Sequence, residues 1–372
     1  MGYTQGEFWI WVYNGGMVRV AINGFGRIGR AFFRAAWKDS EVEIVGINDL
    51  GDAANFAYLL KYDSVYGVFE PQVKAENSGL TVGDPSTSLG ASKRVHYTSE
   101  KDPAMLPWRE LNVDVVVEST GVFESYEKAS AHLGAGAKRV VITAPVKDPE
   151  GQQAAYGAGD TVQGATVLVG VNEEKLNTCQ ISSNGSCTTN AGSPLIAILD
   201  EKLGIEKALL NTVHAYTATQ SLVDGPVRGS DLRRGRAAAQ NITPSSTGAA
   251  VAVTKAYESL AGKFDGISLR VPVVAGSIAD ITFVAKRPTT VEEVNQILEA
   301  AAKEERWQGI FAASNEPLVS SDIVGNPHAA IADLAMTRVI GETLVKVLAW
   351  YDNEMGYAHT LLRHVKAAAL AK

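Results

Sequence analysis

The chain has 372 residues, of which 46% are hydrophobic and 20% are charged, so it is too long for one ordinary core and is predicted to form two domains. This balance excludes a disordered chain, and the formal net charge of −7 gives no reason to expect nucleic acid or a membrane as a partner. The sequence lacks an apolar run of the roughly 20 residues that a membrane helix needs.

The first 16 residues are predicted to be an extension outside the fold. Met17 directly precedes the apolar run VRVAIN and could itself be a start codon, whereas the FWIWVY stretch lacks the basic flank and cleavage site of a signal peptide. A small aromatic contact surface is the alternative for this segment. The two cysteines, Cys179 and Cys187, are too few for a disulfide framework and suit a reducing compartment, so we expect a cytoplasmic protein.

A βαβ unit is predicted next. VRVAIN (18–23) has the pattern of a buried strand, RAFFRAAW that of a helix, and EIVGIND (43–49) that of the second strand. Further strands are predicted at 113–118, 139–143 and 166–171, with a helical segment in YEKASAHLGAG. This alternation is typical of a Rossmann-type, doubly wound parallel sheet, here over residues 17–186. The polar, glycine-rich segment 147–164 is predicted to be a surface loop.

The pattern changes in the second half of the chain. Strands are predicted in LLNTVHAY, GISLRVPVV, ADITFVA and TLVKVLAWY, and amphipathic helices in AAVAVTKAYESLA and TVEEVNQILEAAAKEE. Strands with segregated helices indicate an α+β catalytic domain with a mostly antiparallel sheet over residues 187–351. TLLRHVKAAALAK is predicted to be a terminal helix, within residues 352–372, that completes the first domain.

A dinucleotide site is predicted at the first turn of the βαβ unit. Gly24, Gly26 and Gly29 form G-x-G-x-x-G between a strand and a helix, and Asp49 ends the next strand. The first glycine permits a tight turn, the second lets the backbone approach a pyrophosphate, and the third lets helix and strand pack closely. Asp49 would accept hydrogen bonds from the ribose and repel the additional phosphate of NADP, so the predicted cofactor is NAD. A metal site is not predicted.

A reactive cysteine is predicted at Cys187. It lies in SSNGSCTTN directly before an apolar helical run, and a helix start is expected to lower a thiol pKa and favour the thiolate. Cys179 is expected to be a buried small hydrophobe. His214, in NTVHAYTATQ, lies where a strand gives way to polar residues and could serve as a base, although spacing alone does not show that it meets Cys187.

In order along the chain, GFGRIGR, IND, LLKYDSVYG, VESTG, SCTTN, HAYTATQ, RGRAAAQNITPSSTGAA, RVPV and WYDNEMGY resemble the glyceraldehyde-3-phosphate dehydrogenase family from Met17 to the C-terminus. The resemblance implies a homotetrameric glycolytic enzyme that oxidises D-glyceraldehyde 3-phosphate to 1,3-bisphosphoglycerate with NAD. It implies that Cys187 attacks the aldehyde, that His214 assists hydride transfer, and that inorganic phosphate cleaves the resulting thioester.

The resemblance also assigns binding residues. For the phosphate of the substrate it implies Thr217 and Arg270; for the attacking phosphate it implies Ser186, Thr188, Thr247 and Gly248, with Arg234 close by. Around NAD it places Arg27, Ile28, Asp49, Lys101, Thr120, Thr143 and Asn353. Lys101 stands where the family usually has arginine, and Ala191 stands where it commonly has a second cysteine. Residues 215–240 match a family loop that reaches the cofactor site of a neighbouring subunit.

Two other functions remain open at this level. Erythrose-4-phosphate dehydrogenase shares the nucleophile and the glycine motif, and the segments KYDS and NPHAAIADLAMTRV also resemble it. A noncatalytic NAD-binding redox sensor is the alternative from a different class, because an exposed thiol can respond to peroxide without turning over an aldehyde.

Overall fold

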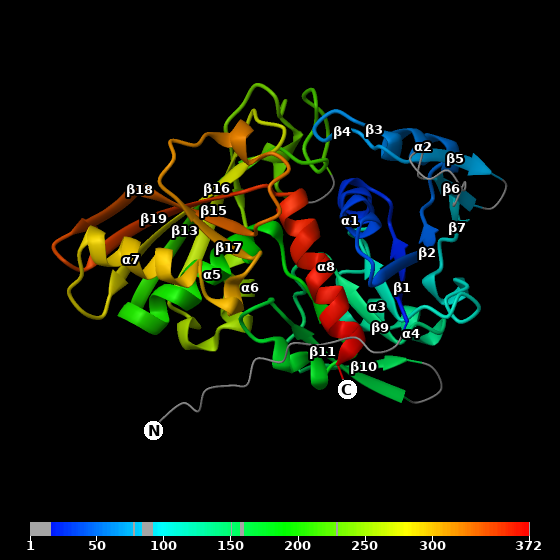
Figure 1. The fold of residues 1–372 in the computed structure, drawn as a ribbon, viewed down its shortest axis with the longest axis horizontal. Coiled ribbons are helices and arrows are strands. Elements are labelled where there is room, and N and C mark those ends of the chain that lie inside the picture. The colour runs from blue at the N-terminus through cyan, green and yellow to red at the C-terminus, as the bar shows by residue number, and fades with distance from the viewer. Residues whose placement is uncertain are drawn as a thin grey trace.

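The computed structural model describes residues 16–76, 79–83, 92–149, 151–156, 160–227 and 230–371. The predicted extension lies outside this part of the chain apart from Gly16. Two large sheets organise the described residues, a ten-stranded sheet on the right of Figure 1 and a seven-stranded sheet on the left, and helix α8 (Met355–Leu370) runs between them.

The ten-stranded sheet is parallel in its centre and antiparallel at both edges. Its order is β10-β11-β12-β9-β8-β1-β2-β7-β6-β5, and the strands from β11 to β7 pair in parallel. The strands are β1 (Val18–Asn23), β2 (Val42–Asn48), β5 (Gln72–Glu76), β6 (Gly79–Gly83), β7 (Ser92–Thr98), β8 (Val115–Glu118), β9 (Arg139–Ile142), β10 (Gln153–Tyr156), β11 (Asp160–Thr166) and β12 (Ile181–Ser183). The predicted doubly wound parallel sheet is therefore confirmed.

Buried aliphatic side chains on both faces explain the central position of β1. Val20 and Ile22 point into a core shared with α1 and α8, whereas Ala21 points into a second core that contains Trp108 and Tyr126. Strands covered on both faces are typical of parallel sheets. The helices associated with this sheet are α1 (Arg27–Trp37), α2 (Ala53–Lys61), α3 (Tyr126–Ala129), α4 (Ala131–Gly134) and α8; β3 (Tyr62–Asp63) pairs with β4 (Gly67–Val68) beside them.

The seven-stranded sheet is mixed and mostly antiparallel, as predicted, in the order β14-β15-β13-β16-β19-β18-β17. Its strands are β13 (Ile205–Ala215), β14 (Thr243–Ser246), β15 (Phe264–Val271), β16 (Ser277–Ala285), β17 (Phe311–Ser314), β18 (Ala330–Ile340) and β19 (Leu344–Tyr351). Its helices are α5 (Cys187–Leu203), α6 (Ala249–Ala256) and α7 (Val291–Ala301). Short 3₁₀ helices lie at Pro103–Met105, Glu173–Asn177, Leu232–Gly235, Glu258–Leu260, Glu305–Trp307 and Ser320–Ile323.

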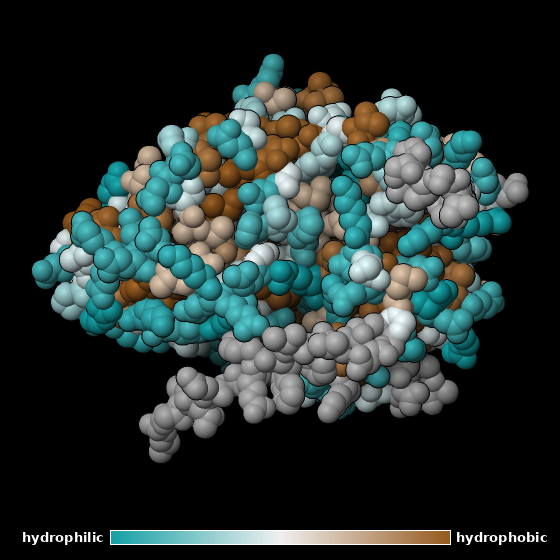
Figure 2. Space-filling model, viewed as in Figure 1, coloured by the Kyte–Doolittle hydropathy of each residue, from teal (hydrophilic) through white to brown (hydrophobic). Residues whose placement is uncertain are grey.

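The two faces of this second sheet differ. Helices α5, α6 and α7 share one hydrophobic core with it, in which Leu195, Ile281 and Leu298 are buried. On the other side Leu209, Ile267 and Leu344 stay exposed although they lie in strands. Figure 2 likewise shows hydrophobic residues gathered on the surface of the half of the molecule that holds this sheet.

Two predictions about the segment before Cys187 are wrong. Residues 147–164 are not simply a surface loop, because β10 and β11 form an antiparallel pair that extends the sheet, with Ala154 and Val162 buried. The strand predicted at 166–171 instead ends at Thr166. Glycine is common in loops, but a Cβ at Gly164 would lie 2.2 Å from the ring of Tyr126, so this glycine serves close packing inside a strand.

Helix boundaries differ in smaller ways. YEKASAHLGAG forms the two short helices α3 and α4 rather than one. The terminal helix begins at Met355, before the predicted TLLRHVK run, and its residues Tyr357, Leu361 and Val365 join the core of the first sheet. Among the described residues, no helix is both long and apolar enough to cross a membrane.

Candidate active site

Cys187 is the first residue of α5, as the sequence predicts. Ser186 caps the helix, because its hydroxyl accepts a hydrogen bond from the Thr189 N–H (3.1 Å) while the Thr189 hydroxyl accepts one from the Ser186 N–H (3.1 Å). Gly185 precedes the cap with φ +61°, a conformation that favours glycine. The sequence GSCTT therefore fixes the place at which the thiol leaves the loop and enters the helix.

His214 meets this thiol. It is the penultimate residue of β13, and its Nε2 lies 3.2 Å from Sγ of Cys187. The two residues are 27 positions apart in sequence and come from different elements, so only the packing of α5 on the second sheet brings them together. Cys187 is half-buried and touches the hydrophobic cores of both halves.

The other ring nitrogen of His214 determines which tautomer suits this contact. Nδ1 lies 2.6 Å from the Ala215 carbonyl oxygen and 2.6 Å from a guanidinium nitrogen of Arg270. The Ala215 carbonyl can only accept, so it favours a protonated Nδ1, which leaves Nε2 free to accept the thiol proton. Arg270 can only donate, so in this tautomer its guanidinium contacts the ring without a hydrogen bond to Nδ1. Burial and the Arg270 charge lower the pKa of His214 to about 3, so the ring is neutral near pH 7. A neutral ring can accept a proton at Nε2, but the lowered pKa makes His214 a weaker base than a free imidazole.

The expected low pKa of the Cys187 thiol is not what the structure gives. Burial is the largest cause and raises the pKa of this thiol above its usual range, whereas Arg270 and the hydrogen bonds from Thr188 act in the opposite direction. Helix position alone does not offset the loss of solvation at this site. The Arg270 charge therefore favours the thiolate of Cys187.

Of the two residues predicted to bind the substrate phosphate, Arg270 contacts the histidine directly. Arg270 lies opposite His214 in the parallel register of β13 and β15, which explains their contact. Thr217 follows the end of β13, and its hydroxyl bonds to that of Thr219 (2.9 Å). Thr219, which the sequence analysis missed, also accepts from Arg234 (3.1 Å) and so links the two predicted residues. The i, i+2 threonines of HAYTATQ were the available signal.

The residues predicted to bind the attacking phosphate are linked less closely by hydrogen bonds. Ser186 is half-buried at the cap, and Thr188 places its hydroxyl 2.9 Å from that of Tyr351 in the core. Gly248 is the N-cap of α6, and the Thr247 hydroxyl accepts from the Ala249 N–H (3.2 Å). Arg234 lies on the Thr217 side through Thr219 and also donates to Ser245 (3.0 Å).

Each glycine of the nucleotide motif has a distinct environment. Gly24 has φ +94°, and a Cβ there would lie 2.6 Å from the backbone nitrogen of Thr120. A Cβ at Gly29 would lie 2.3 Å from the carbonyl oxygen of Gly24, so this glycine lets α1 pack against the turn. A Cβ at Gly26 would meet no protein atom within 4 Å, which leaves the start of α1 open to a ligand. These environments fit a pyrophosphate at the helix N-terminus.

Asp49 lies directly beside this turn. Its carboxylate accepts hydrogen bonds from the N–H groups of Phe25 (2.7 Å) and Gly51 (3.0 Å), which orient it at the carboxyl edge of the sheet. The Arg27 side chain, in contrast, is occupied by ion pairs to Asp63 (2.5 Å) and Glu354. Only the backbone of Arg27 therefore remains free for a cofactor.

Two other predicted cofactor residues, Thr120 and Thr143, lie at the ends of the neighbouring strands β8 and β9. Thr120 follows β8, and its N–H donates to the buried carboxylate of Glu118 (2.9 Å). Thr143 follows β9, and its N–H donates to the Glu118 carbonyl (3.0 Å). Asn353 is buried and accepts from Ser277 (3.0 Å). Ile28 is half-buried in α1, and Lys101 is exposed beyond β7.

The fold and the site define a nucleotide-dependent dehydrogenase with a thiol–imidazole pair. Residues 18–126 match the family model described as glyceraldehyde 3-phosphate dehydrogenase, NAD binding domain, and residues 186–353 match the C-terminal domain of the same family. The chain belongs to the glyceraldehyde-3-phosphate dehydrogenase family. The predicted cofactor, NAD, is confirmed by the first of these matches.

Curated relatives agree with this assignment. The chain is 45% identical over 348 residues to glyceraldehyde-3-phosphate dehydrogenase 2 of Streptomyces avermitilis, with 93% of this chain and 96% of the relative covered. It is 46% identical over 351 residues to the glyceraldehyde-3-phosphate dehydrogenases of Mycobacterium avium and Mycobacterium tuberculosis, with the same shares covered. These relatives favour neither the erythrose phosphate enzyme nor the noncatalytic sensor.

Proposed function

We propose that this protein oxidises D-glyceraldehyde 3-phosphate to 1,3-bisphosphoglycerate with NAD and inorganic phosphate. The observation that carries the proposal is the contact of 3.2 Å between Sγ of Cys187 and Nε2 of His214, with the Arg270 guanidinium against the same ring. A thiol, a neutral base and a fixed cation are the groups that a covalent aldehyde oxidation of an anionic substrate needs.

The residues act in sequence. His214 takes the thiol proton, Cys187 Sγ bonds to the aldehyde carbon, and the protonated His214 returns that proton to the former aldehyde oxygen, which gives a hemithioacetal. His214 then accepts the hemithioacetal hydroxyl proton as hydride leaves the carbon, which yields a thioester. A phosphate oxygen attacks the thioester carbon, the carbon–sulfur bond breaks, and the acyl phosphate departs while the thiolate is restored. NAD, when bound, supplies the hydride acceptor.

Two groups of residues are proposed to hold the anions. Arg270 and Thr217 suit the phosphate of the substrate because the guanidinium offers two parallel donors and lies beside the base. Ser186, Thr188, Thr247 and Gly248 are proposed for the attacking phosphate. Cofactor contacts are proposed for Gly24, Gly26, Gly29 and Asp49, supported by the open start of α1 and the orientation of the Asp49 carboxylate.

We propose that the protein is a homotetramer and that subunits contact each other through the exposed side of the second sheet. Leu209, Ile267 and Leu344 expose between 41% and 66% of their surface there, an unusual apolar display for a folded monomer. A cytoplasmic location is proposed because the chain has only two cysteines, which are too few for a disulfide framework. We also propose the division at residues 186 and 187, with 352–372 joined to the first domain, since buried residues of α8 belong to the first core.

The test is NADH formation at 340 nm from glyceraldehyde 3-phosphate and NAD, with and without phosphate, beside erythrose 4-phosphate. We expect phosphate-dependent turnover of the triose. Cys187→Ser should lose essentially all turnover and keep NAD binding, because serine lacks the reactive thiolate; Cys179→Ser is the matched control and should stay active. Preference for erythrose 4-phosphate, or turnover by Cys187→Ser, would overturn the proposal.

A further inference from the structure

A fully buried histidine on α8 contacts the segment that carries the nucleophile. His364 has no exposed surface, and its Nε2 lies 2.7 Å from the Ser182 hydroxyl while its Nδ1 lies 3.0 Å from Oδ1 of Asn184. Ser182 and Asn184 are themselves buried, five and three residues before Cys187. The histidine therefore joins the last helix of the chain to the end of β12.

These contacts require one ring tautomer. Oδ1 of Asn184 is an acceptor, so Nδ1 of His364 carries the proton and donates, and Nε2 accepts from the Ser182 hydroxyl. Burial lowers the pKa of His364 to about 3, which keeps the ring neutral with one donor and one acceptor. A leucine at this position would remove the hydrogen bond that each of these two buried side chains makes to the ring.

A second side chain of the same helix supports the segment. Tyr357 lies seven residues before His364, on the same face of α8, and its hydroxyl donates to the Gly185 carbonyl (3.0 Å). From the opposite side, the Asn190 amide of α5 donates to the Asn184 carbonyl (2.7 Å). The residues that precede Cys187 are thus held between α8 and α5.

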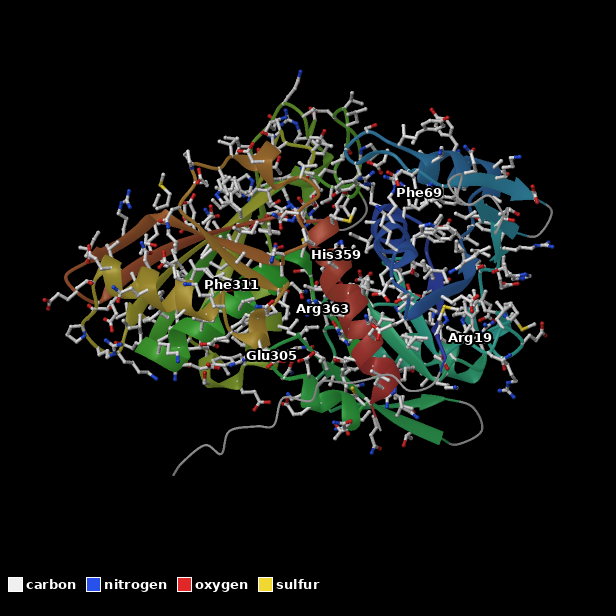
Figure 3. The ribbon with its side chains drawn as sticks, viewed as in Figure 1. Arg19, Phe69, Glu305, Phe311, His359 and Arg363 are labelled. Atoms are coloured by element: carbon white, nitrogen blue, oxygen red, sulfur yellow. The ribbon has the colours of Figure 1, made fainter. Side chains whose placement is uncertain are left out.

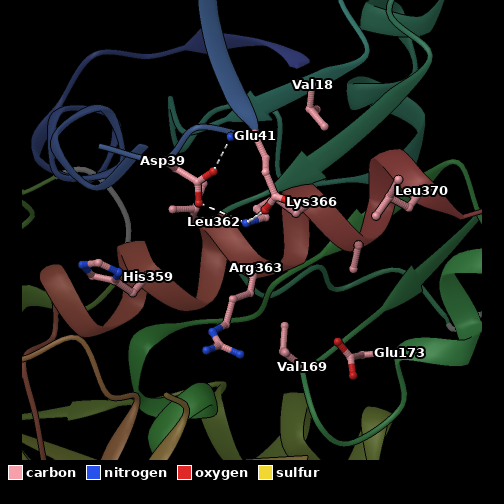
Figure 4. Close-up of a pocket in the computed structure, with 11 residues that line it drawn as sticks. Val18, Asp39, Glu41, Val169, Glu173, His359, Leu362, Arg363, Lys366 and Leu370 are labelled. Carbon is pink, nitrogen blue, oxygen red and sulfur yellow. Dashed lines mark hydrogen bonds and ion pairs between the residues drawn. The ribbon is translucent and has the colours of Figure 1, made fainter. Parts of the chain in front are cut away.

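Helix α8 is in turn anchored on its other faces. Figure 3 shows His359 and Arg363 on this helix, and Figure 4 shows the pocket beside it, in which Lys366 reaches toward Asp39 and Glu41. This pocket has a volume of about 470 Å³. Lys366 pairs with Asp39 (3.0 Å) and with Glu41. These ion pairs fix the helix to the first half of the molecule without touching the segment before Cys187.

We propose that His364 is a positioning residue, which holds the segment 182–186 so that Sγ of Cys187 stays in contact with His214. The inference rests on the proposed function of Cys187. A displacement of about 1 Å between reacting groups can reduce a rate by about 100-fold, so a loosened segment should affect the chemical step. Binding of NAD at the glycine turn should change little, because none of these hydrogen bonds involves that turn.

Three variants test the inference. His364→Leu removes both hydrogen bonds at similar size, and His364→Gln keeps one donor and one acceptor in a planar group. Lys366→Met is the control, because it loosens α8 away from the nucleophile. The readouts are kcat, the KM for NAD, and the rate at which iodoacetamide labels Cys187, followed by mass spectrometry of the labelled peptide.

We expect His364→Leu to lower kcat and the labelling rate about 10- to 100-fold, with the KM for NAD within about twofold. His364→Gln should stay within about threefold of the parent, and Lys366→Met should keep the parental kcat. Equal kcat in His364→Leu and the parent would overturn the inference. An equal loss of kcat in His364→Gln or in Lys366→Met would also overturn the inference, because each result would indicate a merely structural role.

If His364→Leu does not fold, Ser182→Ala removes one partner with a smaller change. We expect it to lower the labelling rate about threefold or more, because the His364 ring then loses the hydroxyl that orients it; a parental rate overturns the inference. Failure of the proposed function looks different, because the parent itself would show neither aldehyde turnover nor selective labelling of Cys187.

Discussion

Arg270→Met should raise the pKa of both members of the thiol–imidazole pair. The Arg270 charge lowers the pKa of His214, because it disfavours the imidazolium, and it lowers the pKa of Cys187, because it favours the thiolate. Two unit charges about 4 Å apart interact by about 4 kcal/mol at an effective dielectric constant of about 20, or about three pKa units. Burial remains in the variant, so we expect a rise of about one to two units for His214.

Two measurements check this prediction. The ring protons of His214, assigned by their loss in His214→Asn, should titrate at higher pH in Arg270→Met than in the parent. The rate of iodoacetamide labelling at Cys187 should require a higher pH and fall about tenfold per unit of pKa near neutrality. Arg270→Lys keeps the charge and should behave more like the parent. Unchanged profiles in a folded Arg270→Met would refute the assignment of Arg270 as the charge that sets both groups.

Two further predictions concern the cofactor and the effect of pH on stability. Asp49→Ala should relax the preference for NAD over NADP by about tenfold or more in kcat/KM. Asp49→Asn keeps an acceptor for the Phe25 N–H but not the charge, so it should relax the preference through lost repulsion alone. An unchanged preference in both variants would remove Asp49 from the ribose site. His214 and His364 have a pKa of about 3 in the folded state and about 6.5 in the unfolded state. The unfolded state therefore binds more protons below pH 6.5. Each residue lowers the free energy of unfolding by about 1.4 kcal/mol per pH unit as the pH falls toward 3. Urea unfolding at fixed protein concentration should show His364→Gln losing less stability than the parent between pH 6.5 and 5, and equal losses would contradict this reasoning.

Local sequence patterns determined much of the secondary structure and several turns of this protein. The turn at Gly24, the start of α5 at Cys187 and the parallel core strands follow from short-range sequence, because glycine conformation, helix capping and buried aliphatic runs depend on neighbouring residues. The same reasoning failed at Gly164, where a glycine that signals a loop serves instead to admit the Tyr126 ring. Local signals do not distinguish these two uses of glycine.

Only the tertiary structure decided how the site is assembled. Cys187 and His214 meet because α5 packs on β13, and Arg270 joins them through the register of β15. Packing also reversed the expected direction of the Cys187 pKa, since burial outweighs the helix start, and it occupied the Arg27 side chain with ion pairs. His364 gave no signal in the sequence, because its partners precede it by about 180 residues and a buried contact of that separation exists only once the chain has folded.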